Sequence, residues 1–389
     1  MYYRFLHYIT AKSNCQEERK KEYVNRYKTN NYSRSDYHCC GSLGKTCSQS
    51  IYESAVGRHI VWGKLLMSNK EKRGKNKLLW GFIYVITFIA VFCASAVIKM
   101  TCNSSQNVYK TNWDESVGTV HTDISYDNGE ANKYDLYLPA DKTKENYGLV
   151  VYLHAGGFTT GDKSDDEQML KWLCSKGYVA AGINYTLRTD SNSASVLSQS
   201  NEIKAAIPQV VEKAAEYGYQ IDKLTMAGGS AGHALAMIYA FRDAGQSPVP
   251  VVLTFGAVGP ASFYQEDWGI YGLDQSDEAC AAMFSIMAGT EIKPEEIQDG
   301  SYLEKVKPIS ASMWVDKDAP PCVVAYGTKD KMQPYLASLK LKKALESNGI
   351  DYQYFELPHS GHGLQNDDKI SIQWMDTVVE YLDKYMPVE

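Results

Sequence analysis

The stretch TMAGGSAGHALAM, residues 225–237, decides the fold of this chain. The residues before Gly228 are strand-like, and those after Gly232 have the apolar spacing of a buried helix. Gly228 and Gly232 each lie two residues from Ser230, which gives the pattern G-x-S-x-G. Such a strand-to-helix join has three interpretations, namely a catalytic serine on a sharp turn, a phosphate loop, or a tightly packed corner without chemistry.

Short apolar runs alternate with helical segments around this stretch. The runs are GLVVYLH, YVAAGINY, KLTMAGG, VPVVLTFG and PCVVAYG, and the helical patterns cover residues 165–175, 202–217, 233–243, 335–347 and 369–385. This alternation predicts an α/β fold with a mostly parallel central sheet and helices on both faces. In front of it, TVHTDISY and NKYDLYLP flank a turn signal at residues 127–129, which predicts an N-terminal antiparallel hairpin.

One segment interrupts the alternation, at about residues 259–298. It is rich in aromatic residues and methionine, and it is longer than a strand-to-helix loop requires. We expect a small helical cap insertion over the carboxyl edge of the sheet. Ordinary core aromatics are the alternative interpretation of the same composition.

Chemistry is expected at the carboxyl ends of the strands, where open parallel sheets bind ligands. A serine on a strained turn needs glycines at positions 228 and 232, because side chains there collide. HAGG, residues 154–157, follows another apolar run, and its small residues let backbone N–H groups turn toward a developing oxyanion. The sequence therefore predicts Ser230 as nucleophile, with oxyanion donors at the backbone N–H groups of Gly156, Gly157 and Ala231, and His154 as a brace for the loop.

A general base is expected in LPHSGHGL, which follows the last strand-like run, YQYFEL. It contains two histidines, His359 and His362. We prefer His362, because its flanking glycines let the ring approach Ser230 more freely. Asp330 ends PCVVAYGTKD and lies just past the preceding strand, where its carboxylate is able to hold the imidazole in the required tautomer.

The motifs HAGGF, GGSAG, YGTKD and HSGHG, in this order, resemble those of α/β-hydrolases of the esterase/lipase group. The resemblance covers about residues 131–385. It extends to the hormone-sensitive-lipase-like carboxylesterases and, more closely, to bacterial esterases labelled BD-FAE-like. Three features depart from the family pattern: Ala155 replaces a glycine, His233 stands where a small residue is common, and NYTLRT differs from the Y-R-L-A-P stretch.

The resemblance implies a carboxylic ester hydrolase that acts on a small-molecule ester through Ser230, Asp330, His362 and an acyl-enzyme, without a cofactor or metal. Two alternatives stay open: a deacetylase or feruloyl-type esterase acting on polysaccharide, and a catalytically inactive hydrolase fold used for binding. A phosphate loop is disfavoured, because no lysine accompanies Ser230 within the motif. No C-x-x-C or H-E-x-x-H spacing predicts a zinc site.

The whole chain has a net charge of −6, divided between a basic leader, residues 1–77, and an acidic body. An acidic body argues against a nucleic-acid partner. Residues 78–98 carry no charge and match the ~20 residues that a membrane-spanning helix needs. Because lysines crowd the upstream flank, the leader is expected in the cytoplasm and the body outside.

We expect residues 78–98 to act as a transmembrane signal anchor in the cell membrane. Cleavage after Ala96, which ends an A-x-A pattern, gives a secreted protein instead. Residues 99–116 are predicted to form a polar linker and residues 117–389 the catalytic domain. The sequence leaves the oligomeric state open.

Overall fold

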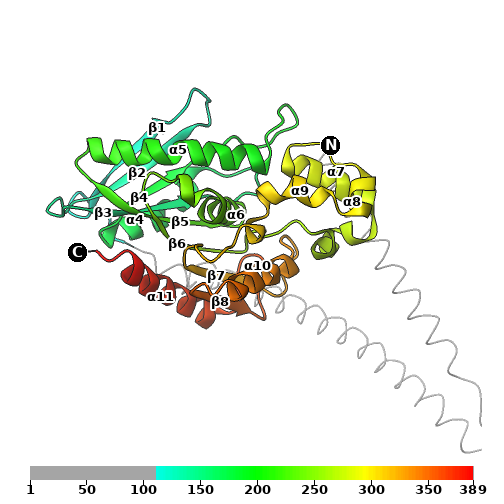
Figure 1. Ribbon diagram of the computed structural model, residues 1–389. Helices are drawn as coiled ribbons and strands as arrows, with labels where there is room; N and C mark the ends of the chain where they lie inside the picture. The colour runs from blue at the N-terminus through cyan, green and yellow to red at the C-terminus, as the bar shows by residue number, and fades with distance from the viewer. Residues whose placement is uncertain (1–110, 389) are drawn as a thin grey trace, which may run out of the picture. The chain divides into compact units, whose positions relative to one another are not determined.

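The computed structural model describes residues 111–388, which contain one eight-stranded sheet (Figure 1). The strands are β1 (Gly118–Ser125), β2 (Lys133–Pro139), β3 (Tyr147–Leu153), β4 (Val179–Ile183), β5 (Ile221–Gly229), β6 (Val251–Ala257), β7 (Cys322–Gly327) and β8 (Tyr352–Leu357). Their order across the sheet is β1-β2-β4-β3-β5-β6-β7-β8. β2 pairs antiparallel with both β1 and β4, and all other pairs are parallel. The predicted mixed sheet with an entry hairpin is confirmed.

Helices cover both faces of the sheet, as the alternation predicts. They are α4 (Glu167–Ser175), α5 (Val196–Glu216), α6 (Ala231–Ile238), α10 (Tyr335–Ser347) and α11 (Asp368–Tyr385). Alternate residues of β3 pack into two separate cores: Leu149 and Val151 face α5 and α6, whereas Val150 faces α4 and α11. The near-continuous apolar strands follow from this burial on two sides.

The insertion between β6 and β7 is helical. It contains α7 (Asp277–Ala288), α8 (Pro294–Asp299), α9 (Tyr302–Val306) and short 3₁₀ segments, and these helices form a group beside the sheet (Figure 1). Its helical turns continue to Met313, beyond the expected end at residue 298. Some aromatic residues of the segment form a small core of their own: Phe263 stacks on Trp268, and Phe284 meets both rings edge-to-face.

The insertion contacts loops that follow two different strands. The hydroxyl of Tyr271 donates to the carbonyl of Met332, 2.7 Å away, in the loop after β7. At the end of α7, a Cβ added to Gly289 lies 2.5 Å from the hydroxyl of Ser195, in the loop after β4. The insertion therefore borders the carboxyl edge of the sheet.

Helix α5 begins at Val196, earlier than the predicted residue 202. Ser195 caps it: its Oγ accepts from the N–H of Ser198, and the Ser198 hydroxyl accepts from the N–H of Ser195. Such a reciprocal cap satisfies N–H groups that have no partner inside a helix. The extra residues are VLSQSN, two adjacent apolar residues followed by four polar ones, so they carry no helical apolar spacing that would reveal the turn.

The leader, the apolar segment 78–98 and the linker up to residue 110 lie outside the described residues. Within residues 111–388, no helix is long and apolar enough to cross a membrane. The expectations about anchoring and cleavage therefore remain predictions from the sequence.

Candidate active site

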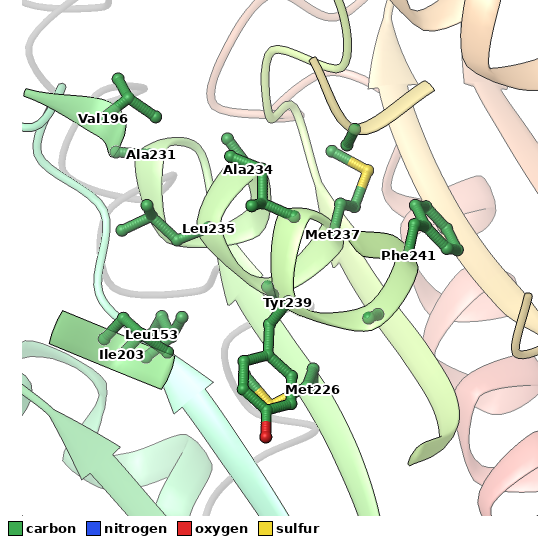
Figure 2. Packing of buried hydrophobic residues seen from close by; sticks show 14 of the residues in the cluster. Leu153, Val196, Ile203, Met226, Ala231, Ala234, Leu235, Met237, Tyr239 and Phe241 are labelled. Carbon is green, nitrogen blue, oxygen red and sulfur yellow. The ribbon is translucent and has the colours of Figure 1, made fainter. Parts of the chain in front are cut away.

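Ser230 lies on the turn between β5 and α6, with φ 51° and ψ −117°. A non-glycine residue at positive φ is strained by on the order of 1–3 kcal/mol and persists where its surroundings hold it. Here the backbone N–H of Ser230 donates to the carbonyl of Ala257 at the end of β6, 2.9 Å away. All residues of α6 are buried, and Figure 2 shows the helix packed against Leu153, Met226 and Ile203. The turn is thus fixed from the strand side and from the helix side.

The glycines around Ser230 are required by close backbone contacts. A Cβ at Gly232 lies 1.9 Å from the carbonyl oxygen of Leu153 on β3, and a Cβ at Gly228 lies 2.5 Å from the carbonyl carbon of Gly232. Distances below 3.0 Å to backbone atoms leave no room for a methyl group. The predicted collisions therefore involve the neighbouring strand as well as the turn itself.

We expect Gly232→Ala to lower the free energy of unfolding by on the order of 3 kcal/mol, because the methyl group meets rigid backbone. Thermal unfolding measures this as a midpoint lower by roughly 5–10 °C. Gly245→Ala is the matched control, since a Cβ there meets nothing within 4 Å. Equal stability of Gly232→Ala and wild type contradicts the steric explanation.

The structure brings His362 and Asp330 to Ser230. His362 Nε2 lies 2.9 Å from Ser230 Oγ, and His362 Nδ1 lies 2.8 Å from Asp330 Oδ2. A carboxylate only accepts hydrogen bonds, so the Nδ1–H donates to Asp330 and Nε2 is left to accept the serine proton. These residues follow β5, β7 and β8, three parallel strands of the same sheet, and so meet at its carboxyl edge.

The carboxylate of Asp330 is held from its other side by the backbone. Its Oδ1 accepts the N–H groups of Met332 (2.7 Å) and Gln333 (2.9 Å). Its side chain is 3 % exposed, whereas that of His362 is 24 % exposed. The Asp330 carboxylate is therefore held in place and shielded from solvent, whereas the His362 ring remains accessible to small molecules.

His359, the alternative base, lies elsewhere. Its side chain is 70 % exposed, and its Nδ1 is 2.8 Å from Asp367 Oδ1. The other carboxylate oxygen of Asp367 accepts the N–H of His359 and the hydroxyl of Ser360. Burial opposes ionisation of Asp367, but these hydrogen bonds outweigh it and lower the pKa of the carboxyl group. This second pair organises the loop that carries His362.

The loop after β3 has three successive residues at positive φ, namely Gly156 (122°), Gly157 (60°) and Phe158 (68°). The carbonyl of Gly156 accepts the N–H groups of Thr159 (3.1 Å) and Thr160 (3.0 Å). In a planar trans peptide the C=O and N–H bonds point in opposite directions. The N–H of Gly157 therefore points away from this closed turn.

His154 orients the preceding peptide in the same way. Its Nδ1 lies 2.7 Å from the carbonyl of Ala155, so the N–H of Gly156 points away from the ring. The imidazole is buried and stacks on Tyr185, with ring centroids 4.3 Å apart. Burial lowers the pKa of His154, which favours the neutral ring. These contacts tie the His154 ring to the loop and to Tyr185, and its role as a brace stays a prediction.

Ala231 supplies the N–H at the start of α6. The carbonyl of Ser230 accepts the N–H of Ala234 (3.1 Å), which directs the Ser230–Ala231 peptide along the helix axis. The first N–H groups of a helix have no partner inside it and carry partial positive charge. The loop after β3 is close by, because a Cβ on Gly229 lies 4.0 Å from that of Ala155. The N–H groups of Gly156, Gly157 and Ala231 thus belong to adjoining segments at one edge of the sheet.

His233, which departs from the family pattern, lies in the first turn of α6 and bonds to the segment that follows β6. It is fully buried, and its Nδ1 accepts the N–H of Gly259 (3.2 Å), just past β6. Burial lowers the pKa of His233 to about 3, so the ring is neutral in the folded protein. Sequence reasoning missed this role, although a histidine inside an apolar helical pattern is a signal of a buried hydrogen-bonding partner.

The pKa of His233 makes stability depend on pH. Unfolding restores its ordinary pKa of about 6.5, so the unfolded chain binds a proton that the folded chain does not. Its stabilising contribution is complete above pH 6.5 and falls by about 1.4 kcal/mol per pH unit down to about pH 3. Urea unfolding at pH 7 and pH 5 should show a loss about 2 kcal/mol smaller in His233→Asn than in wild type. Parallel losses in the two proteins argue against a neutral buried His233.

Among the described residues, no group of three or more histidines, cysteines or carboxylates is placed to hold a metal ion. The polar groups at the site are instead those of a nucleophile, a base, its orienting carboxylate and backbone donors. This set of groups is suited to acyl transfer.

The described domain has the α/β-hydrolase fold. Residues 134–261 match the BD-FAE family, and residues 274–388 match the prolyl oligopeptidase family. The chain is 26% identical over 247 residues to Esterase LipQ of Mycobacterium tuberculosis, covering 62% of this chain and 56% of that protein. It is 31% identical over 116 residues to kynurenine formamidase of Salmo salar, covering 30% of this chain and 37% of that one.

Among solved structures, a truncated form of a carbohydrate esterase from gut microbiota superposes with a TM-score of 0.55 and 20% identity, covering 70% of this chain and 99% of that one. This likeness shows the fold. The resemblance to esterases is confirmed by the curated relatives. The chain spans about half the length of LipQ and little more than a third of the formamidase.

Proposed function

We propose that the protein is a serine hydrolase that cleaves carboxylic esters through an acyl-enzyme. The observation that carries the proposal is the continuous hydrogen-bonded chain from Ser230 Oγ to His362 to Asp330. A serine hydroxyl is a weak nucleophile until an adjacent base takes its proton. The geometry offers that base at 2.9 Å.

The reaction follows from these contacts. His362 Nε2 takes the proton of Ser230 as Oγ attacks the ester carbonyl, and Asp330 stabilises the imidazolium that forms. The imidazolium then protonates the departing alcohol, which leaves an acyl group on Ser230. A water molecule, deprotonated by the same histidine, attacks the acyl-enzyme and releases the acid.

The negative charge on the carbonyl oxygen needs donors that are already oriented. We assign this role to the N–H groups of Gly156, Gly157 and Ala231. Hydrogen bonds to the carbonyls of Ala155, Gly156 and Ser230 fix the three peptide planes before substrate arrives. One such donor contributes about 3–4 kcal/mol to lowering a barrier.

An ester panel with the full chain tests the reaction class. It contains p-nitrophenyl esters of increasing acyl length, acetylated and feruloylated sugars, and an N-formyl arylamine. We expect turnover of small esters at rates well above the buffer background. Failure to hydrolyse any ester, together with no reaction with a fluorophosphonate, contradicts the proposal.

Two other substrate classes enter the panel for stated reasons. Polysaccharide esters are included because a structural neighbour is a carbohydrate esterase, and the formamide because a relative is a kynurenine formamidase. The same nucleophile, base and oxyanion donors serve amide cleavage, so relative kcat/KM values decide between them. A catalytically inactive binding protein is disfavoured by the complete hydrogen-bonded chain at Ser230.

For location we propose, from the sequence alone, that residues 78–98 anchor the protein with its catalytic domain outside the cytoplasm. The terminal sequence of the protein isolated from cells tests this. If the mature chain begins after Ala96, the segment is cleaved and the protein is secreted, and the anchor proposal is wrong.

A further inference from the structure

Phe158 stands beside the proposed oxyanion donors in a conformation that it does not prefer. Its φ is 68°, and a non-glycine residue in the left-handed region is less stable by about 1–2 kcal/mol. Its side chain is buried in the core shared by α5 and α6. Packing therefore fixes the ring, and hydrogen bonds at the carbonyl of Phe158 restrain its backbone.

The carbonyl of Phe158 accepts two hydrogen bonds from outside its own loop. One comes from the backbone N–H of Arg188, 2.9 Å away. The other comes from the side-chain amide of Gln199, whose Nε2 is 2.9 Å from Phe158 O and 2.8 Å from Thr186 O. Gln199 is fully buried in the first turn of α5. Its amide joins the loop after β3 to the loop after β4.

We propose that Gln199 is a positioning residue for the oxyanion donors, an inference that rests on the proposed function. The amide group of a glutamine has two N–H bonds in one plane, and here Nε2 contacts two backbone carbonyls. Together with the N–H of Arg188, this amide holds Phe158 at positive φ. Loss of Gln199 leaves only the Arg188 hydrogen bond on this carbonyl, so the loop is less restrained. A shift of Phe158 toward negative φ then rotates the Gly157–Phe158 peptide and displaces Gly157.

The variant Gln199→Leu removes both donors and keeps a side chain of similar size in the buried position. Gln209→Leu is the matched control, because Gln209 lies on the same helix and is exposed. The rates are expressed per active site titrated with a fluorophosphonate, so that unfolded protein does not count. For p-nitrophenyl acetate we expect kcat to fall by about 10- to 100-fold in Gln199→Leu, with little change in KM. Gln209→Leu should match wild type.

A second readout separates positioning from a general loss of structure. A trifluoromethyl ketone adds to the serine and places an oxyanion in the donor site, whereas the methyl ketone of the same shape binds as a ground state. Gln199→Leu should weaken binding of the first by the same factor as kcat/KM and leave the second unchanged. If Gln199→Leu does not fold, Gln199→Glu keeps the shape while replacing the donor by an acceptor, and the same pattern is expected.

Wild-type kcat per titrated site in the Gln199 variants overturns the inference, as does equal weakening of both ketones. If the wild-type protein reacts with the fluorophosphonate, either of these results overturns only the role of Gln199 and leaves the proposed function standing. A wild-type protein that neither reacts nor hydrolyses esters overturns the proposed function, and the inference with it.

Discussion

Ser230→Ala should abolish ester hydrolysis and leave the fold intact. Removing the nucleophile of a serine hydrolase lowers kcat by about 10⁵-fold or more, because the base and the oxyanion donors cannot form an acyl-enzyme without it. The substitution deletes one hydroxyl and its hydrogen bond to His362, a change of about 1 kcal/mol in stability. Turnover of p-nitrophenyl acetate and thermal unfolding measure the two effects on the same preparation.

The control for this experiment is a serine with no place in the mechanism. Ser338 is fully buried on α10, where its hydroxyl contacts the carbonyl of Tyr335 and the hydroxyl of Tyr354. Ser338→Ala also removes one buried hydroxyl, so its effect on stability should be similar while kcat stays at the wild-type value. Substantial residual kcat in Ser230→Ala excludes Ser230 as the nucleophile.

His362→Ala should lower kcat by a factor close to that of Ser230→Ala, since nucleophile and base act as a unit. The measurement is again kcat for p-nitrophenyl acetate, with free imidazole added to test whether a small base restores part of the rate.

His359→Ala is the matched control, because it removes the other histidine of the same loop. Asp367 keeps the backbone N–H of residue 359 and the hydroxyl of Ser360, which hold the loop, and the lost ring is 70 % exposed, so kcat should change little. If His359→Ala is the more damaging variant, the base has been assigned to the wrong histidine.

The fold was predictable because its signals are local. Each buried strand is a short apolar run, and the helices between them have apolar spacing that fits burial on one side. The elbow around Ser230 was predictable for the same reason, since Gly228 and Gly232 are needed within a few residues of the nucleophile. The position of Asp330 and His362 followed from their places just after two strands of a parallel sheet.

What the sequence did not reveal depends on contacts between distant segments. Gln199 lies in the first turn of α5, before the apolar helical pattern begins, and its acceptors are 41 and 13 residues away along the chain. His233 looked like a departure from the family pattern, and only the position of Gly259 shows what its Nδ1 accepts. The flanking glycines favoured His362 over His359 as the base, but only the structure gives the 2.9 Å between its Nε2 and Ser230 Oγ.

The measurement that tests the central claim most directly is the location of a fluorophosphonate adduct by peptide mass spectrometry. The reagent needs a serine activated by its base and an oxyanion site, so it reports on the assembled site and not on hydroxyl groups in general. The native full chain should carry one adduct, on the peptide that contains Ser230, and heat-unfolded protein should carry none. An adduct on another serine, or equal labelling of native and unfolded protein, contradicts the account.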